Sequence, residues 1–84
     1  MKHAREDYNR FQDPLNKIPE DEPVMLFRAQ DKYAVAALSG YVKAILEDPE
    51  ATEEAAEVYE VVNNFIAEFK DWHTKKSPDL DKAL

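Results

Sequence analysis

The second half of the chain carries the most regular pattern of apolar residues in the sequence. These residues recur at spacings of three and four, which places them on one side of an α-helix. They are Ala55, Val58, Tyr59, Val62, Phe65, Ile66, Phe69 and Trp72. Thr52 is suited to cap the amino end, and Glu53 and Glu54 follow it where the helix dipole favours negative charge. We therefore predict a helix over residues 52–74.

A second amphipathic segment precedes this one. Asp31 can accept hydrogen bonds from the amides of a first helical turn, so we predict a helix over residues 31–47. Its apolar side comprises Ala34, Val35, Leu38, Tyr41, Val42, Ile45 and Leu46. Three small residues spaced by four, Ala36, Gly40 and Ala44, would let another backbone approach closely. Because the polar strip of this helix is narrow, we expect the N-terminal part of the chain or a second copy to cover the remainder.

Pro49 ends the first helix, because proline lacks an amide donor and clashes with the preceding helical turn. The connection to the second helix is short, which favours antiparallel neighbours. The predicted fold class is mainly α, an antiparallel two-helix hairpin. An irregular arm over residues 1–22 precedes it, and a tail over residues 75–84 is predicted to fray. Such a hairpin exposes much of its first helix, so we expect a homo-oligomer, most simply a dimer.

Residues 23–30 form a short apolar run that contains Arg28, and we predict that this run is extended. Side chains on an extended backbone alternate between two faces. Val24 and Leu26 would share one face with Arg28, and Met25, Phe27 and Ala29 would share the other. Both faces are largely apolar. We therefore expect the segment to be covered on two sides.

The arm contains two isolated aromatic residues, Tyr8 and Phe11, that could share one face of a short helical turn. They either fold back onto the domain, which is the commoner outcome for large apolar groups, or contact a partner.

Composition and charge limit the classes of protein to which this chain can belong. The chain has 84 residues, which suits one domain, and no cysteine, which fits a reducing intracellular compartment. Its start lacks the apolar region of a secretion signal, and no run approaches the roughly 20 apolar residues that span a bilayer. We therefore expect a cytoplasmic protein with no membrane segment. The net charge is −7, with six acidic and no basic residues over residues 49–69, which makes direct binding of duplex DNA unexpected.

Arg28, Lys32 and Tyr33 form the first candidate binding site. A guanidinium within an apolar run needs an anionic partner, which Asp31 or Glu22 could supply as a structural ion pair, the more common arrangement. Alternatively, the free amides at the start of a helix could combine with these three side chains to hold an anionic nucleotide, with Tyr33 stacking on the base. No glycine-rich phosphate loop accompanies them.

The carboxylates of the second predicted helix are the other candidate surface, with Glu57 and Glu60 near its middle. A row of carboxylates can imitate a nucleic-acid backbone, although such a row is more often a solvated helix face. The two histidines, His3 and His73, lack the spacing of metal ligands, and no catalytic constellation is visible. We therefore expect neither a cofactor nor a metal, and we do not expect an enzyme.

The stretch Asp13-Pro-Leu-Asn-Lys-Ile-Pro-Glu-Asp-Glu-Pro-Val-Met-Leu-Phe-Arg-Ala-Gln-Asp-Lys32 resembles small uncharacterised proteins encoded by tailed bacteriophages and prophages. The likeness lies in an Ile-Pro-x-Asp-Glu-Pro-Val element, an Arg-Ala-Gln-Asp element, a helical region and a Lys-x-Pro-Asp-like tail, here Lys76-Ser-Pro-Asp79. The stretch covers about a quarter of the chain, and the rest agrees only in layout. The resemblance implies a phage accessory protein but assigns no activity and no residue role.

Two functional hypotheses follow from these features. In the first, a non-enzymatic phage protein engages and modulates a bacterial host protein, as in host takeover or anti-defence, through the arm or the acidic helix. In the second, the chain sequesters an anionic nucleotide signal at Arg28, Lys32 and Tyr33. A structural or assembly role in the virion is a third possibility.

Overall fold

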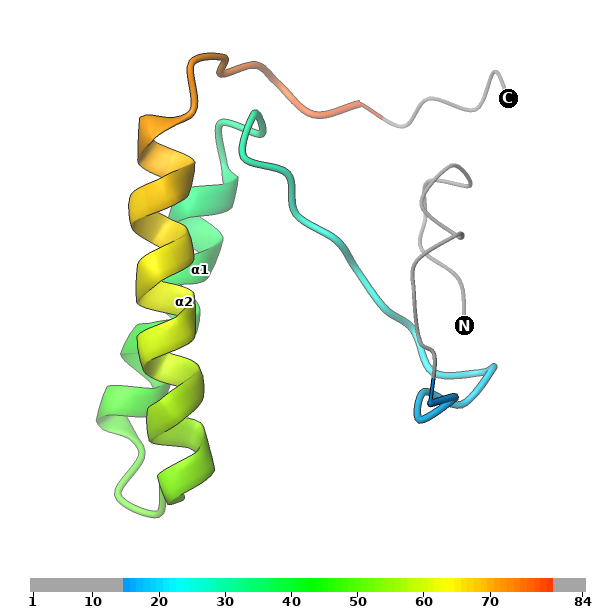
Figure 1. The fold of residues 1–84 in the computed structure, drawn as a ribbon, viewed down its shortest axis with the longest axis vertical. Helices are drawn as coiled ribbons and strands as arrows, with labels where there is room; N and C mark the ends of the chain where they lie inside the picture. Colours follow the sequence, from blue (N-terminus) through cyan, green and yellow to red (C-terminus); the bar gives the residue numbers. More distant parts are fainter. Residues whose placement is uncertain (1–14, 80–84) are drawn as a thin grey trace. The chain divides into compact units, whose positions relative to one another are not determined.

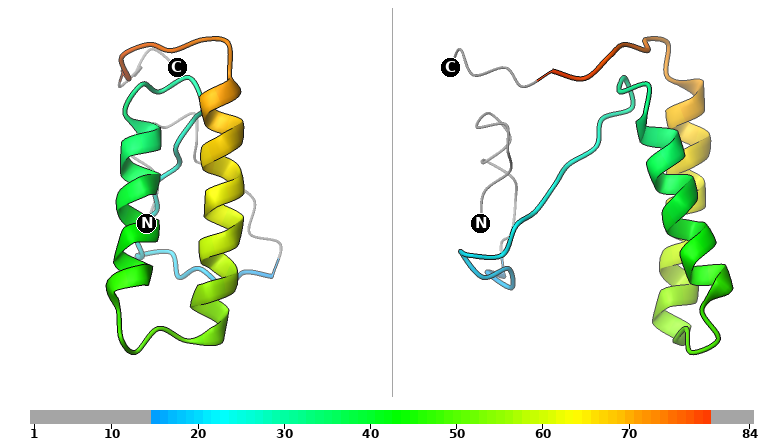
Figure 2. Two further views of the ribbon diagram at one scale, coloured as in Figure 1. Left: turned by 90° about the vertical axis from the view of Figure 1, so that its left-hand side faces the viewer. Right: turned by 180° about the vertical axis from the view of Figure 1, so that it is seen from behind.

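The structure of this chain is a computed structural model that describes residues 15–79. Two α-helices, α1 (Ala34–Glu47) and α2 (Glu53–Asp71), are the elements of this part of the chain and pack against each other (Figure 1). Figure 2 shows them side by side and antiparallel, joined by a short turn. The predicted fold class, a mainly α two-helix hairpin, is confirmed. Both helices belong to one compact unit, Arg28–Pro78, whereas the described residues 15–27 and Asp79 belong to another.

The two helices meet through one narrow strip of each. On α1 the strip consists of Ala34, Val35, Leu38, Val42 and Ile45, and on α2 it consists of Ala55, Tyr59, Val62, Ile66 and Phe69, all of them buried or half-buried. Full burial is rarer. Among the described apolar residues, Ala34, Val42 and Ile66 are the buried ones, at 0 %, 8 % and 8 % exposure. The hairpin therefore has a thin core.

The turn between the helices is held by local hydrogen bonds. The Asp48 amide donates to the Ile45 carbonyl at 3.2 Å, and the Asp48 carboxylate accepts from the Glu50 amide at 2.9 Å. Thr52 is the N-cap of α2, because its hydroxyl accepts from the Ala55 amide at 3.0 Å. This confirms the predicted cap.

Helix α1 begins at Ala34, three residues later than predicted. Asp31 does accept a hydrogen bond, but from the Tyr33 amide at 2.8 Å, as in a turn formed by an aspartate with its own backbone. The backbone on either side of Asp31 is hydrogen-bonded to Lys76. The Lys32 amide donates to the Lys76 carbonyl at 3.0 Å, and the Gln30 carbonyl accepts from the Lys76 amide at 2.8 Å. Residues 31–33 therefore form a turn that leads into the helix.

Helix α2 ends at Asp71, three residues before the predicted end at residue 74. Trp72 is the C-cap, with φ −64° and ψ 135°, so the chain leaves the helix in an extended conformation. The Trp72 amide still donates to the Phe69 carbonyl at 3.2 Å.

Residues 75 and 76 close the open end of the hairpin, and the prediction that the tail frays is wrong for them. Asp31 and Lys76 form an isolated parallel bridge, in which the Lys76 amide donates to the Gln30 carbonyl at 2.8 Å. The Lys75 ammonium donates to the Ala29 carbonyl at 2.9 Å and also to the Phe69 carbonyl in the last turn of α2. We call these contacts the clip. It joins the start of α1 to the end of α2.

The segment before the clip has no helix or strand over residues 23–28. Met25 is 73 % exposed, and Leu26 and Phe27 are also exposed. Coverage of this segment on two sides therefore stays a prediction.

Replacing Lys75 by methionine should destabilise the hairpin, because it keeps most of the aliphatic stem but removes the charged donor of the clip. Lys75 is exposed, so we expect a loss of about 1 kcal/mol in the free energy of unfolding. That corresponds to a melting temperature lower by about 4–8 °C for a domain of this size, measured by circular dichroism.

The matched control is Lys76→Met, since Lys76 enters the clip through its backbone amide and carbonyl. Equal melting temperatures for the two variants would show that the Lys75 ammonium does not hold the hairpin closed.

Candidate functional site

The three residues of the predicted anion site lie at the start of α1, close to the clip. Arg28 is exposed. Its carbonyl accepts from the Asp31 amide at 3.0 Å. The Lys32 ammonium lies 5.2 Å from the centre of the Tyr33 ring, within the range of a cation–π contact.

The start of α1 already holds a carboxylate. Asp31 is half-buried and accepts from the Tyr33 amide, while its carbonyl accepts from the Ala34 amide at 3.0 Å. A phosphate at this helix end would have to compete with that carboxylate for the same amides and tolerate its negative charge. The geometry therefore disfavours an anionic ligand at this position.

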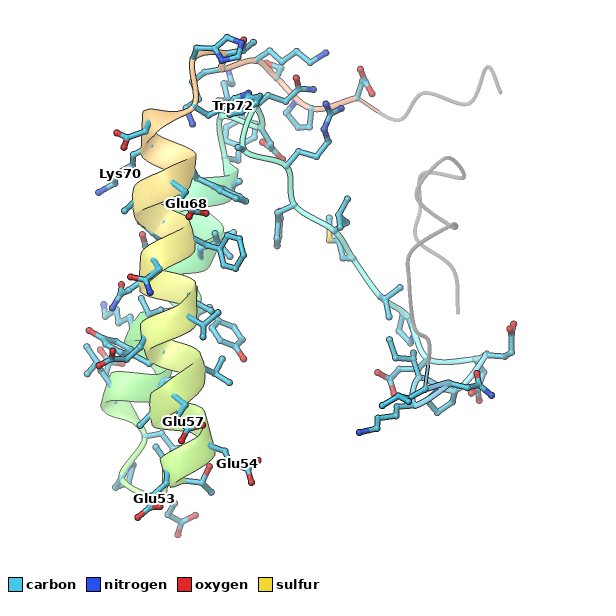
Figure 3. All side chains as sticks on the ribbon, viewed as in Figure 1. Glu53, Glu54, Glu57, Glu68, Lys70 and Trp72 are labelled. Atoms are coloured by element: carbon cyan, nitrogen blue, oxygen red, sulfur yellow. The ribbon has the colours of Figure 1, made fainter. Side chains whose placement is uncertain are left out.

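Five of the six carboxylates of α2 lie on the side that faces away from α1. The sixth, Glu54 in the first turn, is rotated by about 100° from the strip that contacts α1 and lies on the same side as Val58 and Phe65. We define this acidic side by its exposed polar residues, Glu53, Glu57, Glu60, Asn64, Glu68 and Asp71. Figure 3 shows Glu57 and Glu68 on the surface of α2 turned to the viewer, with Glu53 at the amino end. Helix α2 holds six acidic residues and one lysine, a net charge of −5. Glu57 and Glu60 are therefore on the surface, as predicted.

A second surface on α2 is apolar and exposed. Val58, Val61 and Phe65 are 40 %, 53 % and 49 % exposed, and Trp72 at the end of the helix is also exposed. At about 100° per residue, these four residues are rotated by about 90° from the strip that contacts α1. The sequence pattern had assigned Val58, Phe65 and Trp72 to the contact with α1. The structure corrects this assignment, because one neighbouring helix covers only part of so wide an apolar face.

Tyr41 brings α1 into the same surface. It is exposed, and it is rotated from the contact strip of α1 by about 70° in the same sense as the exposed apolar residues of α2. Two antiparallel helices that face each other place such positions on the same side of the pair. We call Tyr41, Val58, Val61, Phe65 and Trp72 the apolar side of the hairpin. Leu46, also exposed, is rotated in the opposite sense and lies on the other side.

The width of the apolar stripe on α2 was the signal that could have revealed this surface. Val61, which was left out of the predicted packing face, widens the stripe beyond what a single α1 helix can contact. Tyr8 and Phe11, the predicted contacts of the arm, lie outside the described residues.

Residues 15–79 contain no group of three or more His, Asp or Glu side chains that could hold a metal ion. In the same part of the chain, neither helix combines the length and the apolar character needed to cross a bilayer.

Inorganic phosphate and ATP are the probes for the anion site at α1. We expect neither to raise the melting temperature of the protein above that in sodium chloride of equal ionic strength, because Asp31 occupies the relevant amide. A rise that Arg28→Met removes would contradict this expectation and would favour nucleotide sequestration over the host contact.

The chain matches no protein-family model, no curated protein and no solved structure. The two surfaces of the hairpin are therefore the features of the molecule that bear on its function.

Proposed function

We propose that this chain is a non-enzymatic binding protein of phage origin that engages and modulates a host protein in the bacterial cytoplasm. The observation that carries this proposal is the acidic side of α2, which presents five exposed carboxylates on one regular helix. A helix holds these groups at a fixed spacing, so a partner can match them without first ordering a loop.

The acidic side is suited to a partner with a basic surface. Complementary charge steers two proteins together and raises the association rate, an effect that weakens as salt screens the charges. Host proteins that bind nucleic acids carry such basic surfaces, so a row of carboxylates can compete with a phosphate backbone. Modulation would then mean that the partner's basic surface is occupied by α2.

The phage origin is supported by the resemblance of residues 13–32 and Lys76-Ser-Pro-Asp79 to phage and prophage proteins. Sequestration of an anionic nucleotide is the second candidate, since Lys32 and Tyr33 lie side by side at the start of α1. It ranks lower, because the Asp31 carboxylate stands at the same helix end. A role in virion assembly would also use the hairpin as a binding surface.

The test is affinity purification of the tagged protein from bacterial lysate, with mass spectrometry of the captured proteins and of released nucleotides. We expect one host protein at near-stoichiometric yield, lost progressively as salt is raised from about 50 to 500 mM because a contact between charged surfaces is screened. The double variant Glu57→Gln with Glu60→Gln should capture at least about tenfold less of it.

The matched control is Glu22→Gln with Glu50→Gln, which removes the same charge from residues outside α2. Equal loss in both double variants would mean that net charge, and not the acidic side, governs capture. The absence of any salt-sensitive, near-stoichiometric protein would refute the proposal, and a released nucleotide in its place would favour sequestration.

A further inference from the structure

We propose that the apolar side of the hairpin is covered by the apolar side of a second copy, so that the protein is a four-helix homodimer. The two copies are related by a twofold axis parallel to the helices, which sets α1 of each copy against α2 of the other. This assignment uses a different surface from the proposed host contact.

The core of a single hairpin is small. In the described part of the chain, three apolar residues are buried, and only one of them, Ile66, belongs to α2. The aromatic residues Tyr41, Phe65 and Trp72 stay about half exposed, at 53 %, 49 % and 49 %. A domain of this length has a small free energy of unfolding, and rings that stay exposed to water add little to it. Covering one side of the hairpin completes the core.

The exposure is also one-sided, which is what a single partner surface requires. Val58, Val61 and Phe65 lie with Tyr41 on one side of the helix pair, as the rotation of their positions shows. Positions rotated in the opposite sense are mostly small or polar, namely Ala56, Asn63, Ala67 and Lys70 on α2, with Leu46 of α1 as the exception. The apolar side therefore resembles the inner face of a four-helix bundle rather than a scatter of surface residues.

The shapes of the two helices are complementary across this side. Helix α2 presents the larger residues Val58, Val61 and Phe65, whereas α1 presents Ala37 and Ala44 on either side of Tyr41. Large residues on one helix pack into the space above small residues on the other. An arrangement that sets α1 against α2 of the second copy makes this match twice.

Charge selects the same arrangement. Helix α2 has a net charge of −5, whereas α1 contains one lysine and one glutamate, Lys43 and Glu47, which pair with each other at 3.8 Å. An axis perpendicular to the helices would set α2 against α2 and bring two acidic rims together. The parallel axis instead sets each acidic α2 beside a neutral α1, which avoids that repulsion. The acidic sides then remain at the surface of the dimer, and Glu54, in the first turn of α2, is the carboxylate of this helix that lies at the end of the interface.

The available area is sufficient for a specific dimer. At 1.5 Å per residue, α2 is about 28 Å long and α1 about 21 Å, and two adjacent helices are about 20 Å wide. The apolar side thus covers a flat area of about 500 Å² in each copy, or about 1,000 Å² for the two copies together. A total buried area of about 1,000 Å² is the lower limit for a specific protein–protein interface.

The experiment compares the mass of the full-length protein in solution with that of two variants. Ala37 and Ala36 are adjacent exposed residues of α1, but Ala37 lies within the proposed interface, one turn before Tyr41, and Ala36 points away from it. Light scattering after size exclusion should give twice the 9.7 kDa chain mass for the wild type at about 100 µM. We expect Ala37→Glu to weaken the dimer at least about tenfold, because the new carboxylate would be buried beside the acidic rim of α2. Ala36→Glu should leave the dimer unchanged.

A second measurement covers the case in which Ala37→Glu fails to fold. The melting temperature of a dimer rises with protein concentration, whereas that of a monomer does not. We expect the wild type and Ala36→Glu to melt at higher temperature at higher concentration. Unfolded Ala37→Glu together with this dependence would still support the proposal, since folding would then require the interface.

Three outcomes would overturn the proposal. The first is a monomeric wild type with a melting temperature independent of concentration, which would leave the apolar side to another partner. The second is a dimer that Ala36→Glu and Ala37→Glu affect equally, which would place the interface elsewhere. The third is an assembly larger than two chains. Capture of a host protein through Glu57 and Glu60 is compatible with each of these, so the two proposals fail separately.

Discussion

The structure depends on the contact between two helices that are each too apolar for one neighbour. A helix can bury only the strip that faces its partner, and here that strip includes Val42 and Ile66 but leaves Phe65 half exposed. The residual apolar surface is gathered on one side because the positions on α1 and α2 are rotated from the contact strip in the same sense. The thin core and the exposed side are thus two results of the same geometry.

Local hydrogen bonds hold the two helices together at the turn, and long-range hydrogen bonds hold them together at the open end. At the turn, Asp48 and Thr52 satisfy amides that lie two or three residues away. At the open end, the clip joins residues far apart in the sequence, with Lys75 and Ala29 separated by 46 positions. Because the clip also takes up the Phe69 carbonyl in the last turn of α2, it fixes where the helix ends as well as how the ends meet.

The same packing separates the surfaces of α2 by chemistry. The side opposite α1 carries five of the six carboxylates, including Glu57 and Glu60, and the side next to the contact strip carries Val61 and Phe65. A helix that offers an acidic surface and an apolar surface can take part in two contacts at once. The proposed host contact and the proposed dimer use one surface each and do not compete.

Features that depend on residues close together in the chain could be predicted from the amino-acid sequence. Pro49 and the Thr52 cap define the turn, and the spacing of apolar residues defines two antiparallel helices, because both signals act within a few positions. The exposure of Glu57 and Glu60 followed from the same spacing. The start of α1 and the end of α2 depend on a long-range contact, since the bridge between Asp31 and Lys76 requires non-helical backbone at both residues. The exposure of Arg28 and the position of Phe65 beside, and not within, the contact with α1 also depend on how distant segments pack.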